Sequence, residues 1–559
     1  MNLRSPRSRT LRLTALVGAA ALVLGACGSG GGGDDPEGTD AGGTPKPGGS
    51  VSIGLEAETA GWQPGKDSPA APGVSVMLAI YDPLLLRNRE GEITPFLAES
   101  VVKSTDVKEW TIKLRPNVKF HDGTPLTADN QKEAFDKVLT VAGARTAGIL
   151  NGVTMSVIDP LTIKYTLSTP NAAFGEVLAG ASGYAFSMAN YTAKGADISS
   201  NPVGTGPFVF QSWTRDSQLV VKKNPNYWIQ GLPYLDEVVF KPIPDEDARL
   251  ATLQSGGLNM MHTLRQSLVK KAKSSAKVDG FVVYDFLGNN SGANIFNTGK
   301  PPFDDKRVRQ ALVFAIDQKL AINALGGEGM VPESTQLYTP DSPWYSQKAA
   351  ATYPKQDVNK AKSLLASYVA DPARSDKKAV GTPVSFRFDC PPDPSLVDLS
   401  LVYQSFWTAI GARVELRQVE QSVHISEAVG TPPEYRSDYD VKCWRLGGEG
   451  DPDTTLFTQF AVVGGAASNV TDFTTPKLQE LLLKGRTTED IDDRKKIYEE
   501  ISLLFNEEVP FSLAGGTASM VAAKANVKNV MDWTFPDRTT KGPSITQSVI
   551  TVRELWLDK

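Results

Sequence analysis

The stretch VSFRFDCPPDPSLVDLSLVYQSFWTAIGARVELRQV, residues 384–419, decides the fold class of this chain. Its alternating residues predict a strand over Val384–Phe388, and the longer apolar pattern after the prolines predicts a helix that ends at Ile410. Gly411 stops this helix, because glycine readily adopts the left-handed backbone that follows a helix. A second strand is predicted over Val414–Val419. Two strands joined by a helix are expected to lie parallel, which indicates an α/β fold.

Strands and helices continue to alternate on both sides of this unit. Residues Tyr439–Leu446 predict a third strand of the same sheet. Further upstream, the apolar positions of Val308–Leu320 predict one amphipathic helix, with Arg309 and Asp317 on its solvated side. Asp357 is expected to cap the next helix, since an aspartate side chain can accept hydrogen bonds from the first free backbone N–H groups.

The N-terminus carries an export signal. A basic segment without acids precedes the uncharged run Leu13–Ala26, and the order of basic region, short apolar core and small residues is typical of a secretory signal peptide over residues 1–26. The apolar core is shorter than the roughly 20 residues that span a bilayer. The string Leu24-Gly25-Ala26-Cys27 resembles the bacterial lipobox, which implies that Cys27 is diacylated and becomes the new N-terminus. The alternative is an ordinary secreted protein in which Cys27 has no such role.

Residues 27–49 are rich in Gly, Asp, Thr and Pro and predict a flexible tether, because they cannot bury enough apolar surface to order themselves. The chain has a formal net charge of −5, which argues against a nucleic-acid partner. It contains three histidines and three cysteines, so no histidine-built metal site and no cofactor are expected. With Cys27 acylated, Cys390 and Cys443 could form a disulfide in an oxidising compartment, or remain two separate buried thiols.

No catalytic constellation occurs in the sequence. The chain lacks a Gly-x-Ser-x-Gly elbow, a phosphate-binding loop with its lysine and a His-Glu-x-x-His pair. Asp451 and Asp453 are paired acids, but nothing places a nucleophile beside them, and a solvated or ligand-contacting loop explains them better. The protein is therefore not expected to be an enzyme.

Five strings, in order along the chain, resemble the large solute-binding proteins of peptide-type ABC importers, the oligopeptide- and dipeptide-binding family (solute-binding protein family 5). They are ITPFLAES (93–100), WTIKLRPNVKFHDGTPLTA (110–128), NPVGTGPF (201–208), KNPNYW (223–228) and PFDDKRVRQAL (302–312). Each string alone is weakly specific, but five in family order are not accidental.

The resemblance implies a two-lobed periplasmic-binding-protein-like α/β fold with mixed sheets and a hinged cleft between the lobes. The first lobe is expected over residues 50–290, with an added subdomain at 81–197. The second lobe is expected over residues 291–511, and the chain then returns to the first lobe over 512–559. Closure of the lobes around a ligand is the expected motion.

Ligands of open α/β sheets bind beyond the carboxyl ends of the parallel strands. Two loops meet this condition, one after the opening strand and one after the strand at Tyr439–Leu446. With Asn297 from the expected crossing segment, they supply the candidate ligand contacts Glu58, Trp62, Asn297, Trp444, Arg445, Glu449 and Asp451. Trp62 and Trp444 are expected to face the space between the lobes and to offer flat apolar area. The alternative for either tryptophan is ordinary core packing.

The second loop departs from the peptide-binding pattern. Peptide-binding relatives hold the ligand's ammonium group with an aspartate a few residues after a tryptophan, and the matching position here is Gly448. Glu449 lies one position away, and the acid-proline pair is present as Asp451-Pro452. The first loop has Trp62-Gln63-Pro64 where relatives usually have Leu-Asp-Pro.

The leading hypothesis is a lipid-anchored, monomeric, extracytoplasmic receptor that delivers an oligopeptide or dipeptide to ABC permease subunits served by cytoplasmic ATPases. The alternatives are the same receptor for a non-peptide solute, such as a glycoside, an opine-like compound, a siderophore or another metal chelate, and a surface hydrolase or sensor on the same fold.

Overall fold

A computed structural model gives the structure of the protein and describes residues 43–67, 71–141, 144–429, 438–446, 450–462, 469–542 and 549–559. These residues belong to one compact unit, Gly38–Lys559. Within them, no helix combines the length and the apolar character that crossing a membrane requires.

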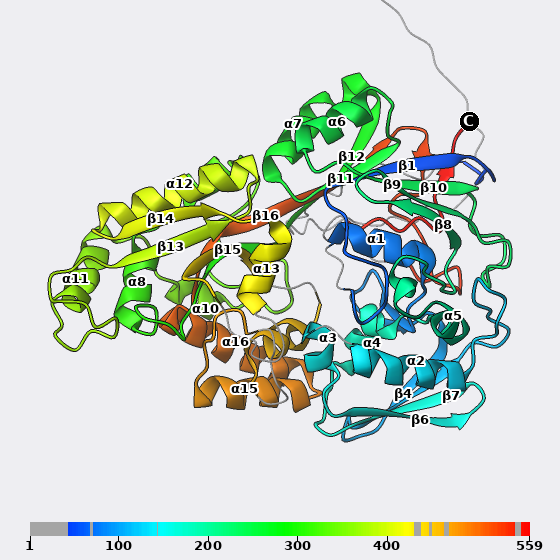
Figure 1. The fold of residues 1–559 in the computed structure, drawn as a ribbon, viewed down its shortest axis with the longest axis horizontal. Helices are drawn as coiled ribbons and strands as arrows, with labels where there is room; N and C mark the ends of the chain where they lie inside the picture. Colours follow the sequence, from blue (N-terminus) through cyan, green and yellow to red (C-terminus); the bar gives the residue numbers. More distant parts are fainter. Residues whose placement is uncertain are drawn as a thin grey trace, which may run out of the picture. The chain divides into compact units, whose positions relative to one another are not determined.

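One ten-stranded mixed sheet organises the molecule, with strand order β14-β13-β15-β12-β16-β11-β1-β10-β9-β8 (Figure 1). Its strands are β1 (Ser50–Leu55), β8 (Phe208–Thr214), β9 (Gln218–Lys223), β10 (Glu237–Pro242), β11 (Met260–Thr263), β12 (Phe281–Phe296), β13 (Ser385–Cys390), β14 (Arg413–Gln418), β15 (Val441–Leu446) and β16 (Phe511–Lys524). Strands β12 and β16 are the two longest and pair antiparallel from Phe281 opposite Lys524 to Ile295 opposite Phe511.

The register of this sheet brings strand ends from both halves together. Strand β11 runs along β16 toward Met520, which lies opposite Thr263. Strand β15 runs along β12 in the other direction and ends with Leu446 opposite Ser291. The carboxyl ends of β11 and β15 therefore both point toward the middle of the β12–β16 pair, where the register is irregular between Leu287 and Ser291.

Two large hydrophobic cores lie on either side of this crossing and define the two lobes. The first core contains residues of β1, β8–β10 and the 81–197 region, including Trp62 and Phe240. The second contains residues of β13, β15 and the helices around them, including Trp407 and Phe388. Strands β12 and β16 contribute to both cores, with Tyr284 in the first and Ile295 in the second.

The first lobe carries a second, four-stranded antiparallel sheet of order β4-β5-β7-β6. Its strands and those of the small hairpin beside it are β2 (Leu85–Arg87), β3 (Ile93–Pro95), β4 (Ala98–Lys103), β5 (Glu109–Leu114), β6 (Val153–Asp159) and β7 (Thr162–Leu167). The helices of this region are α1 (Ala71–Ile80), α2 (Ala128–Val141), α3 (Ala144–Ile149), α4 (Phe174–Ala179), α5 (Met188–Lys194) and the short turns η1 (Ala181–Gly183) and η2 (Gly195–Ser199).

Helices α6 (Glu246–Gln254) and α7 (Gln266–Asp279) flank β11, and a last pair of short strands, β17 (Val527–Lys528) and β18 (Trp556–Leu557), ends the chain. The second lobe contains the remaining helices. They are α8 (Lys306–Phe314), α9 (Gln318–Ala324), α10 (Gln347–Thr352), α11 (Val358–Val369), α12 (Pro394–Ala409), α13 (Gln421–Val429), the π-helical turn η3 (Asp453–Phe457), α14 (Thr458–Phe460), α15 (Pro476–Thr487) and α16 (Ile491–Glu508).

The strand-helix-strand unit predicted from residues 384–419 is confirmed. Strands β13 and β14 pair parallel with α12 between them, and β15 joins the same sheet parallel to β13. Gly411 follows α12 with φ of +99°, the left-handed backbone that ends a helix. The cap at Asp357 is also confirmed, since its side chain accepts a hydrogen bond from the backbone N–H of Lys360 at 2.9 Å.

The single helix predicted over Val308–Leu320 is wrong, because the segment forms two helices. Helix α8 ends before Ala315, and α9 starts anew with Asp317 as its cap. Arg309 is likewise not on a solvated face. Only 3% of it is exposed, and its guanidinium group donates to the main-chain carbonyls of Phe303 and Glu508 at 2.9 and 2.8 Å.

Candidate functional site

The segments that follow β11 and β15 meet at the crossing of the two lobes. The guanidinium group of Arg445, on β15, donates a hydrogen bond to the carbonyl oxygen of Leu264 at 3.4 Å. The next residue, Arg265, donates from Nε to Oδ2 of Asp393 at 2.8 Å. Asp393 also caps α12 just beyond the carboxyl end of β13. Both contacts connect the first lobe to the second at the edge where strand ends converge.

Glu56 lies at the same edge, directly after β1. Its backbone N–H donates to Nε2 of His262 at 3.1 Å, and its carboxylate accepts from the backbone N–H of Leu264 at 3.4 Å. Burial raises the pKa of Glu56, but this effect is outweighed by the interaction with His262 and by the positive charges of Arg265 and Arg445, so the net pKa lies below its usual value. Glu56 is therefore ionised at neutral pH.

His262 itself is fully buried, and burial lowers its pKa to about 4. A neutral imidazole can accept a hydrogen bond at Nε2, which agrees with the bond from the backbone N–H of Glu56. The net positive charge at this edge therefore comes from Arg265 and Arg445 rather than from His262.

Arg445 differs from the neighbouring arginines in its exposure and its pairing. The residue is exposed to solvent, yet surrounding protein lowers the pKa of its guanidinium group to about 10, with the charge of Arg265 acting in the same direction. Within the described part of the chain, Arg445 forms no ion pair, and its hydrogen bond to Leu264 is long.

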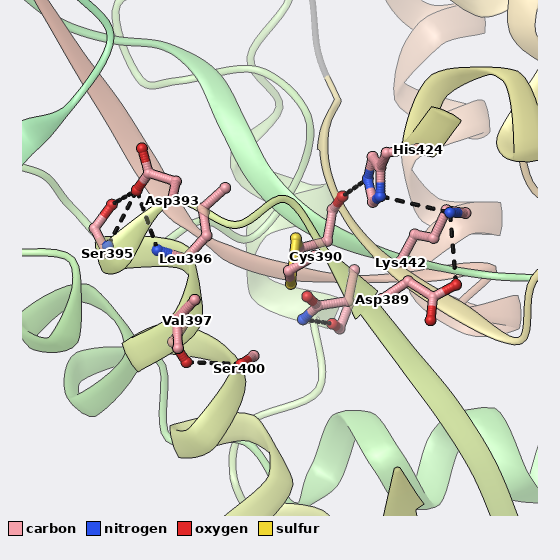
Figure 2. Close-up of a disulfide and its surroundings, with 12 residues drawn as sticks. Asp389, Cys390, Asp393, Ser395, Leu396, Val397, Ser400, His424 and Lys442 are labelled. Carbon is pink, nitrogen blue, oxygen red and sulfur yellow. Dashed lines mark hydrogen bonds and ion pairs between the residues drawn. A yellow bond between two sulfur atoms is a disulfide. The ribbon is translucent and has the colours of Figure 1, made fainter. Parts of the chain in front are cut away.

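A disulfide and a buried charge network hold β13 against β15 beside this edge (Figure 2). Cys390 and Cys443 are bonded with their Cα atoms 5.3 Å apart. This separation lies inside the range of about 4.4–6.8 Å that a disulfide requires. The preceding residues, Asp389 and Lys442, are both fully buried, and Nζ of Lys442 lies 3.5 Å from Oδ2 of Asp389. These links fix the two strands from which Arg445 and Asp393 extend.

Residues of α13 extend the charge network and also contact Trp444 on β15. Lys442 donates to Glu427 at 2.9 Å, and Arg417 donates to Asp389 at 2.7 Å. The Nε2–H group of His424 donates to the carbonyl oxygen of Cys443 at 2.9 Å, and the His424 ring stacks on Trp444 with centroids 5.7 Å apart. Trp444 is half-buried and packs against the second-lobe core.

The structure places Trp62 in the core of the first lobe, which differs from its expected ligand-facing position. Only 2% of the residue is exposed. Its ring packs edge-on against Trp213 with centroids 5.5 Å apart, and its carbonyl accepts from the Tyr81 hydroxyl at 2.9 Å. The loop after β1 folds back onto the β8 hairpin, and this packing removes the ring from solvent.

Two other candidates have structural partners. The carboxylate of Glu58 accepts from Nε1 of Trp213 at 2.5 Å and from the backbone N–H of Asp216 at 3.1 Å. Asn297 is buried, and its Nδ2 donates to the carbonyl of Tyr439 at 3.0 Å. Glu58 therefore anchors the loop after β1, and Asn297 joins the end of β12 to the start of β15.

Asp451, another of the candidate ligand contacts, forms a buried ion pair. Both carboxylate oxygens of Asp451 accept hydrogen bonds from the guanidinium group of Arg494, and Oδ1 also accepts from the backbone N–H of Asp453 at 2.9 Å. This carboxylate is already neutralised inside the second lobe. Glu449 and Cys27 lie outside the described residues.

A second charged cluster joins the subdomain region to the second lobe. Glu176, on α4, forms an ion pair with Arg87, on β2, and lies near Asp451 and Arg494. Burial raises the pKa of Glu176 to about 7 and outweighs the lowering effect of Arg87. Burial likewise raises the pKa of Asp453 to about 6. Both carboxyl groups are thus partly protonated near neutral pH.

The raised pKa values predict that stability increases as the pH falls from about 8 to about 6. The ordinary pKa values are 4.5 for Glu176 and 3.8 for Asp453, so between these values and about 7 and 6 the folded state binds protons that the unfolded state does not. Stability is then lost as the pH rises through the folded pKa values. The urea concentration at the midpoint of unfolding should therefore rise as the pH falls across this range.

Glu176→Gln should flatten this pH dependence, because the amide has no proton to gain. The matched control is Glu480→Gln, at an exposed position on α15. A slope that is the same in the wild type and in Glu176→Gln would contradict the assignment of the proton uptake to this cluster.

The sequence-based selection missed Glu56, Arg265 and Asp393. Each is the first, second or third residue beyond a strand that ends at the lobe crossing, so the rule that selected Glu58 and Arg445 also applied to them. The described residues contain no group of three or more His, Cys, Asp and Glu side chains placed to hold a metal ion.

Comparisons with known proteins agree with this architecture. The family model described as "Bacterial extracellular solute-binding proteins, family 5 Middle" matches residues 92–467. Glutathione-binding protein GsiB of Pectobacterium atrosepticum is 30% identical over 289 residues, which cover 50% of this chain and 55% of that protein. The GsiB protein of Escherichia coli K12 is 30% identical over 278 residues, or 48% of this chain and 54% of that protein. The chain thus spans about half the length of the curated relatives it matches.

Solved structures match over more of the chain. AgaA from A. tumefaciens R10, in complex with agropinic acid, is 27% identical with a TM-score of 0.78, covering 91% of this chain and 99% of that structure. DppA from Helicobacter pylori, in complex with the peptide STSA, is 21% identical with a TM-score of 0.77, covering 92% and 99%. The second likeness concerns the fold, which is that of a two-lobed periplasmic binding protein.

Proposed function

Because the chain belongs to family 5 of the bacterial extracellular solute-binding proteins, we propose that it is an extracytoplasmic receptor that captures an oligopeptide or dipeptide and delivers it to an ABC permease. The observation that carries this proposal is the convergence of charged residues from both lobes on the irregular middle of the β12–β16 pair. A ligand bound there would contact both lobes and favour their closure.

The relatives support this class of solute. Two similar proteins have glutathione and the peptide STSA as their named ligands. The same receptor role for a non-peptide solute is the second candidate, and the observation that favours it is the match to the agropinic acid complex at 27% identity. The receptor would act by binding alone, as a monomer, with permease subunits and their cytoplasmic ATPases as partners.

The ligand can be identified by native mass spectrometry of protein purified under mild conditions. We expect a bound solute at one molecule per protein, released on denaturation and composed of one or more amino acids. A single sugar, siderophore or metal chelate would favour the second candidate. Failure to retain any solute, together with no calorimetric signal from free peptides or from extracts of growth medium, would contradict the receptor role.

We also propose that Cys27 is diacylated and anchors the receptor to the membrane, with residues 27–49 as its tether. Two acyl chains provide stable anchoring, whereas one gives only weak binding. Cys27→Ser should therefore release the protein from membranes or leave its signal peptide uncleaved. The measurement is the distribution between membrane and medium after a high-salt wash, with Ser29→Ala as the matched control. Retention of Cys27→Ser at the wild-type level would contradict the anchor.

A further inference from the structure

We propose that the two lobes carry a latch, separate from their crossing, that takes up protons when it closes and so makes lobe closure depend on pH. The latch joins the 81–197 region of the first lobe to residues 450–460 and 476–494 of the second. This inference goes beyond the proposed receptor function, because it concerns the equilibrium between open and closed lobes and its test needs no ligand.

Main-chain and side-chain groups of the two lobes meet at the latch. The backbone N–H of Ala172, just before α4, donates to the carbonyl oxygen of Arg486, on α15, at 2.9 Å. At the rim, Nζ of Lys103, on β4, forms an ion pair with Oε2 of Glu489 at 3.2 Å. None of these residues belongs to the ten-stranded sheet, so the latch is separate from the crossing of β12 and β16.

The first lobe brings the Arg87–Glu176 ion pair to the latch. Arg87 packs so closely on Gly450 of the second lobe that a Cβ atom at position 450 would lie 2.8 Å from Nη2 of Arg87. Glu176 in turn faces Asp451 and Arg494 of the second lobe, and the like charge of Asp451 acts with burial to raise its pKa to about 7. Opening the lobes would leave the Arg87–Glu176 pair intact but would return its carboxylate to water and remove it from Asp451.

The second lobe brings the carboxyl group of Asp453, which is 3% exposed. The titratable and charged groups that face it are Arg486 on α15, Arg494 and Tyr498 on α16, and Asp451 in the segment before η3. From the first lobe, the fully buried Asn171 lies against Asp453 and lowers its pKa, while burial raises the pKa more strongly, to about 6. Part of the surface that desolvates Asp453 therefore belongs to the opposite lobe.

Proton uptake on closure follows from these surroundings. In open lobes the pKa values of Glu176 and Asp453 move toward their ordinary 4.5 and 3.8, whereas in closed lobes they are about 7 and about 6. Between these values the closed form binds protons that the open form does not, so closure is favoured as the pH falls and is lost as the pH rises through the closed-form values. From pH 8 to pH 6 the ratio of closed to open molecules should rise about 10- to 20-fold. A bound solute would be held more tightly at the lower pH.

The test uses the full-length protein without ligand, between pH 8 and pH 6 and well below its melting temperature. Hydrogen exchange, resolved to single amides by mass spectrometry and corrected for intrinsic exchange, gives the protection factor of the Ala172 amide, which donates across the lobes. This factor should rise about 10- to 20-fold as the pH falls. The matched control is the Leu167 amide, which donates to the carbonyl of Lys108 within the first lobe at 2.8 Å. It should stay better protected than the Ala172 amide at each pH, because the latch opens without unfolding the lobe.

Two variants separate proton uptake from the contact itself. Glu176→Gln carries an uncharged amide, as a protonated carboxyl group would be, so the rise in Ala172 protection should shrink to about twofold, the part left to Asp453. Its control, Glu480→Gln at an exposed position on α15, should keep the wild-type rise. Gly450→Ala places a methyl group against Arg87 and should lower the protection at both pH values. By small-angle X-ray scattering, Gly450→Ala at pH 8 should have a larger radius of gyration than the wild type at pH 6.

Each outcome decides the proposal. Ala172 protection that stays constant from pH 8 to pH 6 overturns proton uptake by the latch. Protection equal to that of Leu167 at each pH also overturns it, because the contact would then open only on unfolding. These two results need no variant. A full wild-type rise in Glu176→Gln overturns the role of Glu176, and equal radii of gyration overturn the link to lobe closure. Solute binding is measured separately, so the receptor role stands or fails independently.

Discussion

Arg494→Met is expected to lower the free energy of unfolding by about 3–5 kcal/mol, the usual cost of removing one partner from a buried ion pair. The side chains of Arg494 and Asp451 are 5% and 11% exposed, and the guanidinium group binds both carboxylate oxygens. The substitution would leave the Asp451 carboxylate buried, with the backbone N–H of Asp453 still donating to it. Urea denaturation followed by tryptophan fluorescence measures the change.

The control for charge removal is Lys496→Met on the same helix, where the side chain is 73% exposed and the effect should be small. The double variant Arg494→Met/Asp451→Asn should recover part of the loss, because no uncompensated charge would remain. A loss for Arg494→Met no greater than that for Lys496→Met would show that the pair is not buried in solution.

Trp62→Ala is expected to destabilise the protein by about 3–5 kcal/mol, as large-to-small substitutions of core aromatic residues do. The indole is 2% exposed and packs on Trp213, so its removal leaves a cavity in the first-lobe core. Ligand affinity of the remaining folded protein should be unchanged. The melting temperature and calorimetric binding constants provide the two readouts.

Trp444→Ala is the matched comparison, because Trp444 is only half-buried and lies next to Arg445. It should cost less stability, about 1–3 kcal/mol, and it should weaken ligand binding. Weakened binding in a stable Trp62→Ala variant would restore the ligand-facing role first expected for Trp62, and the loop after β1 would then have to open in solution.

Local sequence patterns determined the class of fold and many of its elements. The alternating residues of β13 and β14, the apolar face of α12 and the stop at Gly411 act within a few residues of one another, so they could be interpreted directly. The cap at Asp357 is equally local. Family membership also followed from the sequence, because its strings recur in order along the chain.

Only the tertiary structure decided which charged and aromatic residues are buried or paired with other residues. Arg309, Arg445 and Arg494 are equivalent as residue types, but their surroundings differ. Arg309 binds the main chain 199 residues away, and Arg494 binds a carboxylate 43 residues away, whereas Arg445 has one long hydrogen bond within the described residues. Burial and pairing depend on contacts between distant segments, and periodicity and capping report only on neighbours in the chain. For that reason Trp62 could not be assigned to the core, nor Glu56 to the site, until the register of β11, β12, β15 and β16 had brought their segments together.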